Sequence, residues 1–173
     1  MTISISSSFS LQNLTTVDTA DIFQLVEANR PLLEKYLYWA EGVTDLSTTK
    51  KYIEDRVNSG LEGAQWLKFV FEGETVGVFG IKSVCAITGE AEVGYWLSQH
   101  AQGKGLVTQA MEAVIHLLRE RGAKCLVITC LEQNKASIAV AKRVGASHVE
   151  TKPNYLTLDG NLQDLFIYSL ALE

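Results

Sequence analysis

Alternation between apolar and polar residues divides the chain into strand-like and helix-like segments. Residues 9–14 alternate as expected for a half-buried strand. Two pairs of apolar runs are separated by turn residues, 72–75 in one pair and Asp159-Gly160 in the other, and each pair predicts a hairpin. Residues 124–131 are almost wholly apolar, which predicts a strand covered on both faces. The predicted strands are residues 9–14, 66–71, 76–81, 91–97, 124–131, 155–158 and 164–172.

Three helices are expected in the first third of the chain, where apolar residues recur at helical spacing. The first begins near Asp18, and Pro31 suits the first turn of a second helix that ends near position 39. Ser47 is the expected cap of a third helix with Ile53 and Val57 on its inner face.

Two more helices are expected further along. One follows the glycines near position 105 and stops at Gly122, and the other spans residues 136–144 and ends before Gly145. Strands and helices therefore mix along the chain, and this order predicts a single mixed α/β sheet.

Length and composition favour one folded domain spanning residues 1–173. Hydrophobic residues make up 47% of the chain and charged residues 20%, the balance of a protein with a real core. The net charge of −5 lacks the basic excess of nucleic-acid-binding proteins, so direct nucleic-acid binding is not expected.

Membrane, secretory, disulfide and metal signals are weak. No run approaches the roughly 18–20 apolar residues of a membrane span, and the serine-rich start lacks the features of a signal peptide. The three cysteines form no CxxC pair, and Cys125 and Cys130 are about 16 Å apart on one extended strand, too far to bridge. The three histidines have no metal-ligand spacing. We therefore expect a cytoplasmic protein with no metal.

The segment Gln102-Gly103-Lys104-Gly105 carries the strongest chemical signal, because it joins a predicted strand to a predicted helix. Glycines there permit positive φ and close approach of the backbone to a ligand. The first amides of the helix lack internal acceptors, so a phosphate can accept from several of them. Lys104 adds a positive charge beside the same place.

Two better-known phosphate motifs do not fit this loop. A Walker motif requires glycine where Ser98 stands, and Ser or Thr where Gly105 stands. A dinucleotide fingerprint that starts at Gly103 requires a third glycine at Thr108. Nucleotide binding of either kind is therefore disfavoured.

Segments around the loop complete a larger pattern: residues 29–30, 37–39, 92–97, 134–137 and 145–146. With the loop they resemble the GNAT superfamily of N-acetyltransferases, and within it the RimJ/RimL branch of ribosomal-protein N-terminal acetyltransferases. The family signature is Gln or Arg, two residues, Gly, one residue, then Gly or Ala. Gln102 and Gly105 match it, and Val107 departs at the last position.

The resemblance implies the GNAT fold, a single mixed, mostly antiparallel twisted sheet flanked by helices on both faces, and it implies acetyl-CoA as co-substrate. Main-chain amides of the loop would hold the pyrophosphate, and the strand before it would pair with the pantetheine arm and polarise the thioester carbonyl. The side chains of Tyr95 and Trp96 themselves are expected to pack in the core or in the wall of the site rather than to take part in the chemistry. The implied cofactor-binding residues are Tyr95, Trp96, Leu97, Gln102, Gly103, Lys104, Gly105, Leu106, Val107, Thr108, Asn134 and Ser137.

The resemblance implies a hydrogen-bonding partner for the cofactor, a general acid and a general base. Asn134 is a favoured helix N-cap and, by resemblance, also a hydrogen-bonding partner of the pantetheine arm. Ser137 matches the family position near the cofactor sulfur, where it would protonate the departing thiolate. Glu92 is the first candidate for the general base and Glu90 the second, although each is also explained as a solvated strand carboxylate. Cys130, near the cofactor thiol, is expected to be structural rather than a nucleophile.

The acceptor follows from the weakness of this base. At neutral pH an α-amine of pKa about 7.7–8.0 is partly neutral, whereas a lysine of pKa about 10.4 is almost wholly charged. A protein N-terminal α-amine, of the ribosomal-protein type, is therefore favoured. A small amine such as a polyamine, or a catalytically weak domain that only senses coenzyme A, remain the alternatives. A homodimer is compatible with the resemblance.

Overall fold

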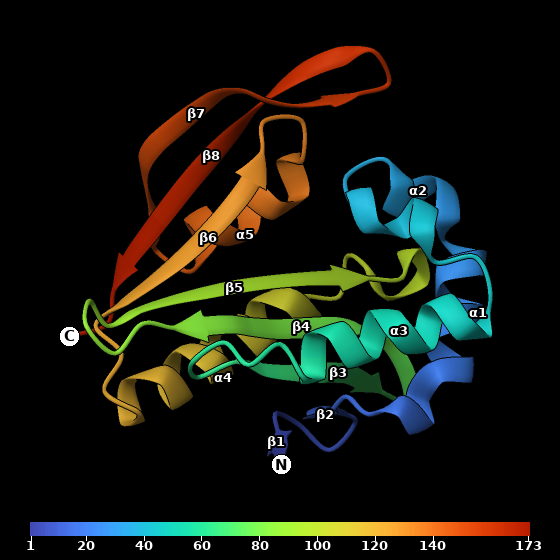
Figure 1. The fold of residues 1–173 in the computed structure, drawn as a ribbon. Helices are drawn as coiled ribbons and strands as arrows, with labels where there is room; N and C mark the ends of the chain where they lie inside the picture. The colour runs from blue at the N-terminus through green and yellow to red at the C-terminus, as the bar shows by residue number, and fades with distance from the viewer.

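The computed structural model describes residues 1–173 and contains one eight-stranded sheet in the order β1-β2-β3-β4-β5-β6-β8-β7. Only β5 and β6 are parallel neighbours, and every other neighbouring pair is antiparallel (Figure 1). The expected mixed, mostly antiparallel sheet is confirmed. The strands are β1 (Thr2–Ser4), β2 (Phe9–Asn13), β3 (Gln65–Phe71), β4 (Glu74–Val84), β5 (Glu90–Leu97), β6 (Cys125–Leu131), β7 (Ser147–Leu158) and β8 (Asn161–Ala171).

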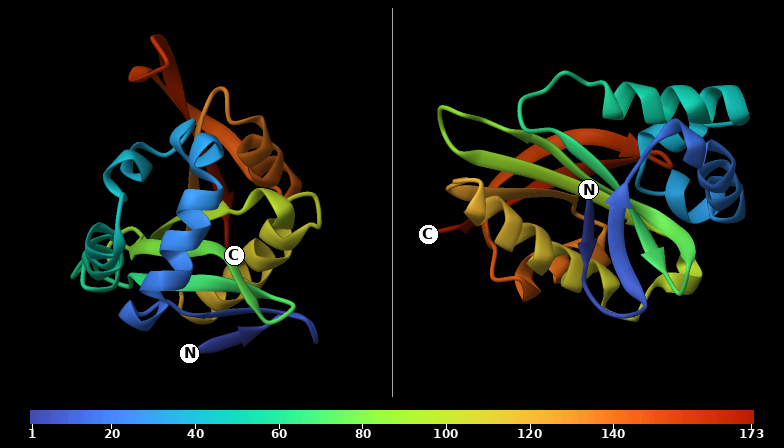
Figure 2. Two further views of the ribbon diagram at one scale, coloured as in Figure 1. Left: turned by 90° about the vertical axis from the view of Figure 1, so that its right-hand side faces the viewer. Right: turned by 90° about the horizontal axis from the view of Figure 1, so that it is seen from below.

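Helices cover both faces of this sheet, with α3 and α4 on opposite sides (Figure 2). Short 3₁₀ turns precede or link several of them. The helices are α1 (Thr19–Ala28), α2 (Arg30–Glu34), α3 (Leu46–Val57), α4 (Leu106–Glu120) and α5 (Lys135–Arg143), with 3₁₀ turns η1 (Thr16–Asp18), η2 (Tyr38–Gly42) and η3 (Gln99–Ala101).

Two hydrophobic clusters attach the helices to the sheet. The larger one joins the strands to α4 and α5, and the smaller one joins them to α1, α2 and α3. β5 serves both clusters, because side chains alternate along a strand: Val93 and Leu97 belong to the larger cluster and Trp96 to the smaller. β4 also serves both clusters, with Phe79 in the larger and Val78 in the smaller, so β4 and β5 together form the centre of the sheet.

The sequence pattern missed strand residues at both ends of the chain. β1 lies in the polar serine-rich start, where no hydrophobic pattern marks a strand. β7 begins at Ser147 rather than near residue 155, and its register with β8 shifts between Lys152 and Leu156. Pro153 lies within that irregularity, which is where proline is tolerated in an edge strand. The exposed, irregular strand gives no apolar alternation to detect.

Three other predictions are corrected by burial and geometry. β6 is not fully covered on both faces: Leu126, Ile128 and Cys130 are buried, whereas the alternate residues 125, 127 and 129 are only half-buried. Val57 is 38% exposed, so it does not lie on the inner face of α3. The second helix ends at Glu34, and a separate 3₁₀ turn, η2, covers positions 38–42.

Asp45, not Ser47, caps α3. The Asp45 carboxylate accepts a hydrogen bond of 2.7 Å from the backbone N–H of Thr48, and the Thr48 hydroxyl accepts one from the Asp45 backbone N–H. This reciprocal pair is a capping box. Hydrogen bonding from Thr48 lowers the pKa of Asp45.

We expect Asp45→Ala to lower the melting temperature by about 2–4 °C and Ser47→Ala to change it less, because only Asp45 satisfies a free helix amide. Since the folded-state pKa of Asp45 is below its unfolded value, the charged cap stabilises above about pH 3.9 and weakens as pH falls through the folded pKa. Thermal melts of both variants between pH 3 and pH 7 test this; a larger loss for Ser47→Ala contradicts it.

Candidate active site

The loop before α4 leaves a row of backbone donors free. Gly103 and Gly105 have φ of +75° and +73°, and Gly105 is the N-cap of α4 with no side-chain hydrogen bond. The N–H of Gln102 bonds to Gln99 and that of Gln109 bonds to Gly105, but none from residues 103–108 donates within the protein. Six consecutive amides are thus available to an acceptor, as an anion site at a helix start requires.

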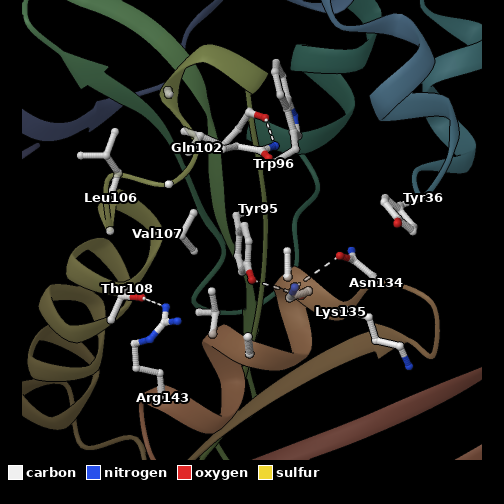
Figure 3. A pocket seen from close by; sticks show the side chains of 18 of the residues that line it. Tyr36, Tyr95, Trp96, Gln102, Leu106, Val107, Thr108, Asn134, Lys135 and Arg143 are labelled. Atoms are coloured by element: carbon white, nitrogen blue, oxygen red, sulfur yellow. Dashed lines mark hydrogen bonds between the residues drawn. The ribbon is translucent and has the colours of Figure 1, made fainter.

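A cavity of about 970 Å³ opens directly at these amides. It runs between α2, β5, the loop, α4 and α5 (Figure 3). All but one of the predicted cofactor-binding residues line it, the exception being Lys104. The lining residues among the predictions are Tyr95, Trp96, Leu97, Gln102, Gly103, Gly105, Leu106, Val107, Thr108, Asn134 and Ser137.

β5 and β6 separate beside this cavity (Figure 1). Their parallel pairing runs from Glu90 opposite Cys125 to Val93 opposite Ile128, and it stops there. Residues 94–97 of β5 stay paired with β4 on their other side. The edge of β5 that faces the cavity therefore carries backbone groups without a strand partner, and these can bind an extended ligand.

A cluster of three polar side chains lies where the two strands separate. The Ser137 hydroxyl is 3.0 Å from the Tyr95 hydroxyl and 3.3 Å from the Cys130 sulfur. Burial raises the pKa of Tyr95 to about 12, against the opposing effect of its hydrogen bond with Ser137. Burial also raises the pKa of the Cys130 thiol. Tyr95 and Cys130 both stay protonated near neutral pH, so the cluster can supply a proton.

Asn134 holds the start of α5 in place. Its side-chain oxygen accepts a hydrogen bond of 3.3 Å from the Ser137 backbone N–H, so the expected N-cap is confirmed (Figure 3). Asn134 also lines the cavity. The capping bond fixes the first turn of α5 and thereby positions the Ser137 hydroxyl.

A model of the acetyltransferase (GNAT) domain matches residues 9–147 of this sequence. The chain belongs to the GNAT family. It is 31% identical over 146 residues to the ribosomal-protein-serine acetyltransferase of Escherichia coli K12, covering 83% of this chain and 82% of that protein.

Two solved acetyltransferase structures resemble the fold closely. RimL, a ribosomal-protein α-N-acetyltransferase solved with coenzyme A, superposes with a TM-score of 0.92 at 26% identity, covering 99% of this chain and 98% of that one. MccE, a microcin C7 self-immunity acetyltransferase solved with acetyl-CoA and AMP, gives 0.88 at 27% identity, covering 98% and 95%.

The site fits coenzyme A in this GNAT chain. The positions of Gly103 and Gly105 are open, since a Cβ at Gly103 meets nothing within 4 Å and one at Gly105 meets only the end of the Gln109 side chain at 3.6 Å. Val107, the departure from the family signature, is half-buried, and its side chain packs against the larger cluster while it also lines the cavity. No group of three His, Cys, Asp or Glu residues that could hold a metal is present.

The structure does not bring Glu92 into the Ser137 cluster. Glu92 does not line the cavity, its carboxylate pairs with Lys82 at 2.8 Å, and strand alternation places it on the sheet face opposite Tyr95. Glu90 lies at the start of β5, still further away. The role of either carboxylate as general base stays a prediction.

Sequence reasoning overlooked one wall of the cavity and part of another. The overlooked wall, here called the α2 wall, consists of Leu32 and Leu33 in α2 and of Tyr36 and Leu37 just after it. The α5 wall could have been found from helical spacing, because Ala136, Ala139, Val140 and Arg143 follow Asn134 and Ser137 around the same face. The α2 wall has no such signal, since its approach to α5 depends on the tertiary fold.

The Tyr36 hydroxyl lies 3.4 Å from the backbone oxygen of Gln133, so it reaches the segment just before α5. Trp96 combines two roles, because it lines the cavity and its indole N–H donates to the Tyr52 hydroxyl at 3.0 Å in the smaller cluster.

No helix is both long and apolar enough to cross a membrane.

Proposed function

We propose that residues 1–173 form one acetyltransferase domain that moves acetyl from acetyl-CoA to the α-amine of a protein N-terminus, with a ribosomal-protein type of acceptor. The observation that carries this proposal is the row of six free amides at residues 103–108, which opens into a cavity ending at the Tyr95–Ser137–Cys130 cluster. One end of this cavity suits a pyrophosphate and the other suits the release of a thiol.

The loop, the edge of β5 and the Ser137 cluster have separate roles. The loop amides bind the pyrophosphate, and the unpaired edge of β5 aligns the pantetheine arm. Bound acetyl-CoA supplies the acetyl group as a thioester. As the amine nitrogen bonds to the acetyl carbon and the C–S bond breaks, the Ser137 hydroxyl gives its proton to the sulfur. Tyr95 reprotonates Ser137 through the 3.0 Å contact between the two hydroxyls, and the proton that the amine loses restores Tyr95.

The choice of an α-amine acceptor rests on the lining of the cavity and on the relatives. The only carboxylate among the lining residues is Glu112 on α4, and no strong base contacts the Ser137 cluster. An α-amine needs less help than a lysine to lose its proton, because its pKa is lower by about 2–3 units. The name of RimL describes an α-N acceptor on a ribosomal protein, and the name of the E. coli relative describes a ribosomal-protein serine.

Incubation with acetyl-CoA and peptides tests this function. Peptides with a free N-terminus should gain acetyl on the α-amine, located by fragment mass spectrometry, while the same peptides with a blocked N-terminus and a free lysine should not. Preferential acetylation of polyamines would show that the acceptor is a small amine rather than a protein N-terminus. Thermal stabilisation by coenzyme A without turnover on any amine would leave only a binding domain.

Location and assembly belong to the same proposal. We propose a cytoplasmic enzyme, supported by three free cysteines and by relatives named for ribosomal proteins. A homodimer is part of the proposal too, supported by the exposed edge strand β7, since an unpaired edge offers backbone groups to another strand. Light scattering coupled to gel filtration measures the mass, and a mass of one chain contradicts the dimer.

A further inference from the structure

Arg143 connects α5 to α4, the two helices that line the cavity. It lies at the last residue of α5, and its Nη1 donates a hydrogen bond of 3.1 Å to the hydroxyl of Thr108 in the first turn of α4 (Figure 3). Thr108 is also the last of the residues with free amides. The guanidinium is therefore held next to the anion site by a contact that involves no carboxylate.

The charge of Arg143 is not neutralised by the protein. No aspartate or glutamate lies within salt-bridge distance of it, and Glu112, which lines the cavity from α4, does not pair with it. A guanidinium has five N–H donors and Thr108 occupies one of them. The others remain available to an anion, and their planar fork matches phosphate oxygens.

The position of Arg143 along the cavity indicates which anion it meets. The lining cations are Lys135 and Arg143. Lys135 is in the first turn of α5, beside Ser137 and the thiol end. Arg143 is at the other end of α5, where the cavity continues past the free amides along Gln109 and Glu112. We expect the nucleoside end of coenzyme A in this part of the cavity. Its ribose carries a phosphate monoester.

We propose that Arg143 binds the 3′-phosphate of coenzyme A, so that the enzyme separates coenzyme A from its 3′-dephospho form. This inference rests on the proposed function, because it takes the cavity to hold coenzyme A. The loop amides serve the pyrophosphate that both ligands share, whereas Arg143 serves the phosphate that only one of them carries. Selectivity therefore depends on a single side chain outside the signature loop.

Calorimetric titration of the apo enzyme with coenzyme A and with 3′-dephospho-coenzyme A tests the inference. Arg143→Ala should weaken coenzyme A binding by about 10–100-fold, as expected for the loss of charge-assisted hydrogen bonds, and should weaken 3′-dephospho-coenzyme A less than twofold. Arg143→Gln, which keeps most of the side-chain length, should show the same selective loss if Arg143→Ala folds poorly.

Lys142→Ala is the matched control, because it removes a neighbouring charge from the same exposed helix end outside the cavity. It should change the dissociation constant of either ligand less than twofold. Equal losses of both ligands in Arg143→Ala, or no loss of either, overturn the inference. Wild-type enzyme that binds both ligands equally also overturns it, whereas wild-type enzyme that binds neither contradicts the proposed function instead.

Discussion

The Gly105→Val variant should lose coenzyme A affinity by about 100-fold or more and remain folded. Gly105 caps α4 at a φ of +73°, a backbone conformation that a β-branched residue adopts only at a cost of about 1–2 kcal/mol. Relief of that strain rotates the free amides of residues 103–108 away from a common acceptor. Each lost hydrogen bond to a charged group costs about 1.5–3 kcal/mol of binding energy. Titration calorimetry with coenzyme A measures the loss.

Gly122→Val is the matched control for this variant. Gly122 follows the other end of α4 at a φ of +79°, a Cβ there meets nothing within 4 Å, and the residue is absent from the cavity wall. Both variants should therefore lose similar thermal stability, and only Gly105→Val should lose the ligand. Equal affinities for coenzyme A in the two variants would show that the loop is an ordinary turn.

The second large effect is expected for Ser137→Ala, which should lower kcat by about 100-fold with less than a threefold change in coenzyme A affinity. The hydroxyl lies between Tyr95 and Cys130 at the sulfur end of the cavity, and general acid catalysis contributes about 10²–10⁴-fold. Its removal leaves the loop amides and the Asn134 cap in place, because both use backbone groups. Steady-state kinetics and calorimetry separate the two quantities.

Ser169→Ala provides the control for Ser137→Ala. Ser169 on β8 makes an equivalent contact, 3.0 Å from its hydroxyl to the sulfur of Cys125, but it lies outside the cavity. Its removal should leave kcat within about twofold of the wild-type value, since no reacting group is near. Comparable kcat losses in both variants, or a parallel loss of affinity in Ser137→Ala, would contradict the division of roles.

The sequence predicted the parts of the site that depend on local chemistry. The Gln102–Gly105 loop, the Asn134 cap and Ser137 all follow from residue type and short spacing, and the structure places them around one cavity. Asp45 was overlooked as a cap although the Asp45–Thr48 pair is also local, because Ser47 is an equally favoured residue at such a position.

The contacts that the sequence could not predict join segments that are distant along the chain. Tyr36 reaches Gln133 across 97 positions, and Lys82, which pairs with Glu92, lies at the shift in the β4–β5 register between Ile81 and Ser83. Neither contact leaves a periodic signal in either partner. The same limit applies to Arg143, whose helical spacing places it on the cavity face but does not reveal that it reaches Thr108.

The short parallel seam between β5 and β6 has a consequence for how occupancy can be observed. Only four residue pairs, from Glu90–Cys125 to Val93–Ile128, join the two strands before they diverge. A molecule lying in the wedge beyond Val93 takes the place of the missing neighbour and shields the facing amides of residues 94–97 from water. Slowed deuterium uptake in that peptide would then report filling of the wedge directly, independent of which amine is supplied and of whether acetyl is transferred.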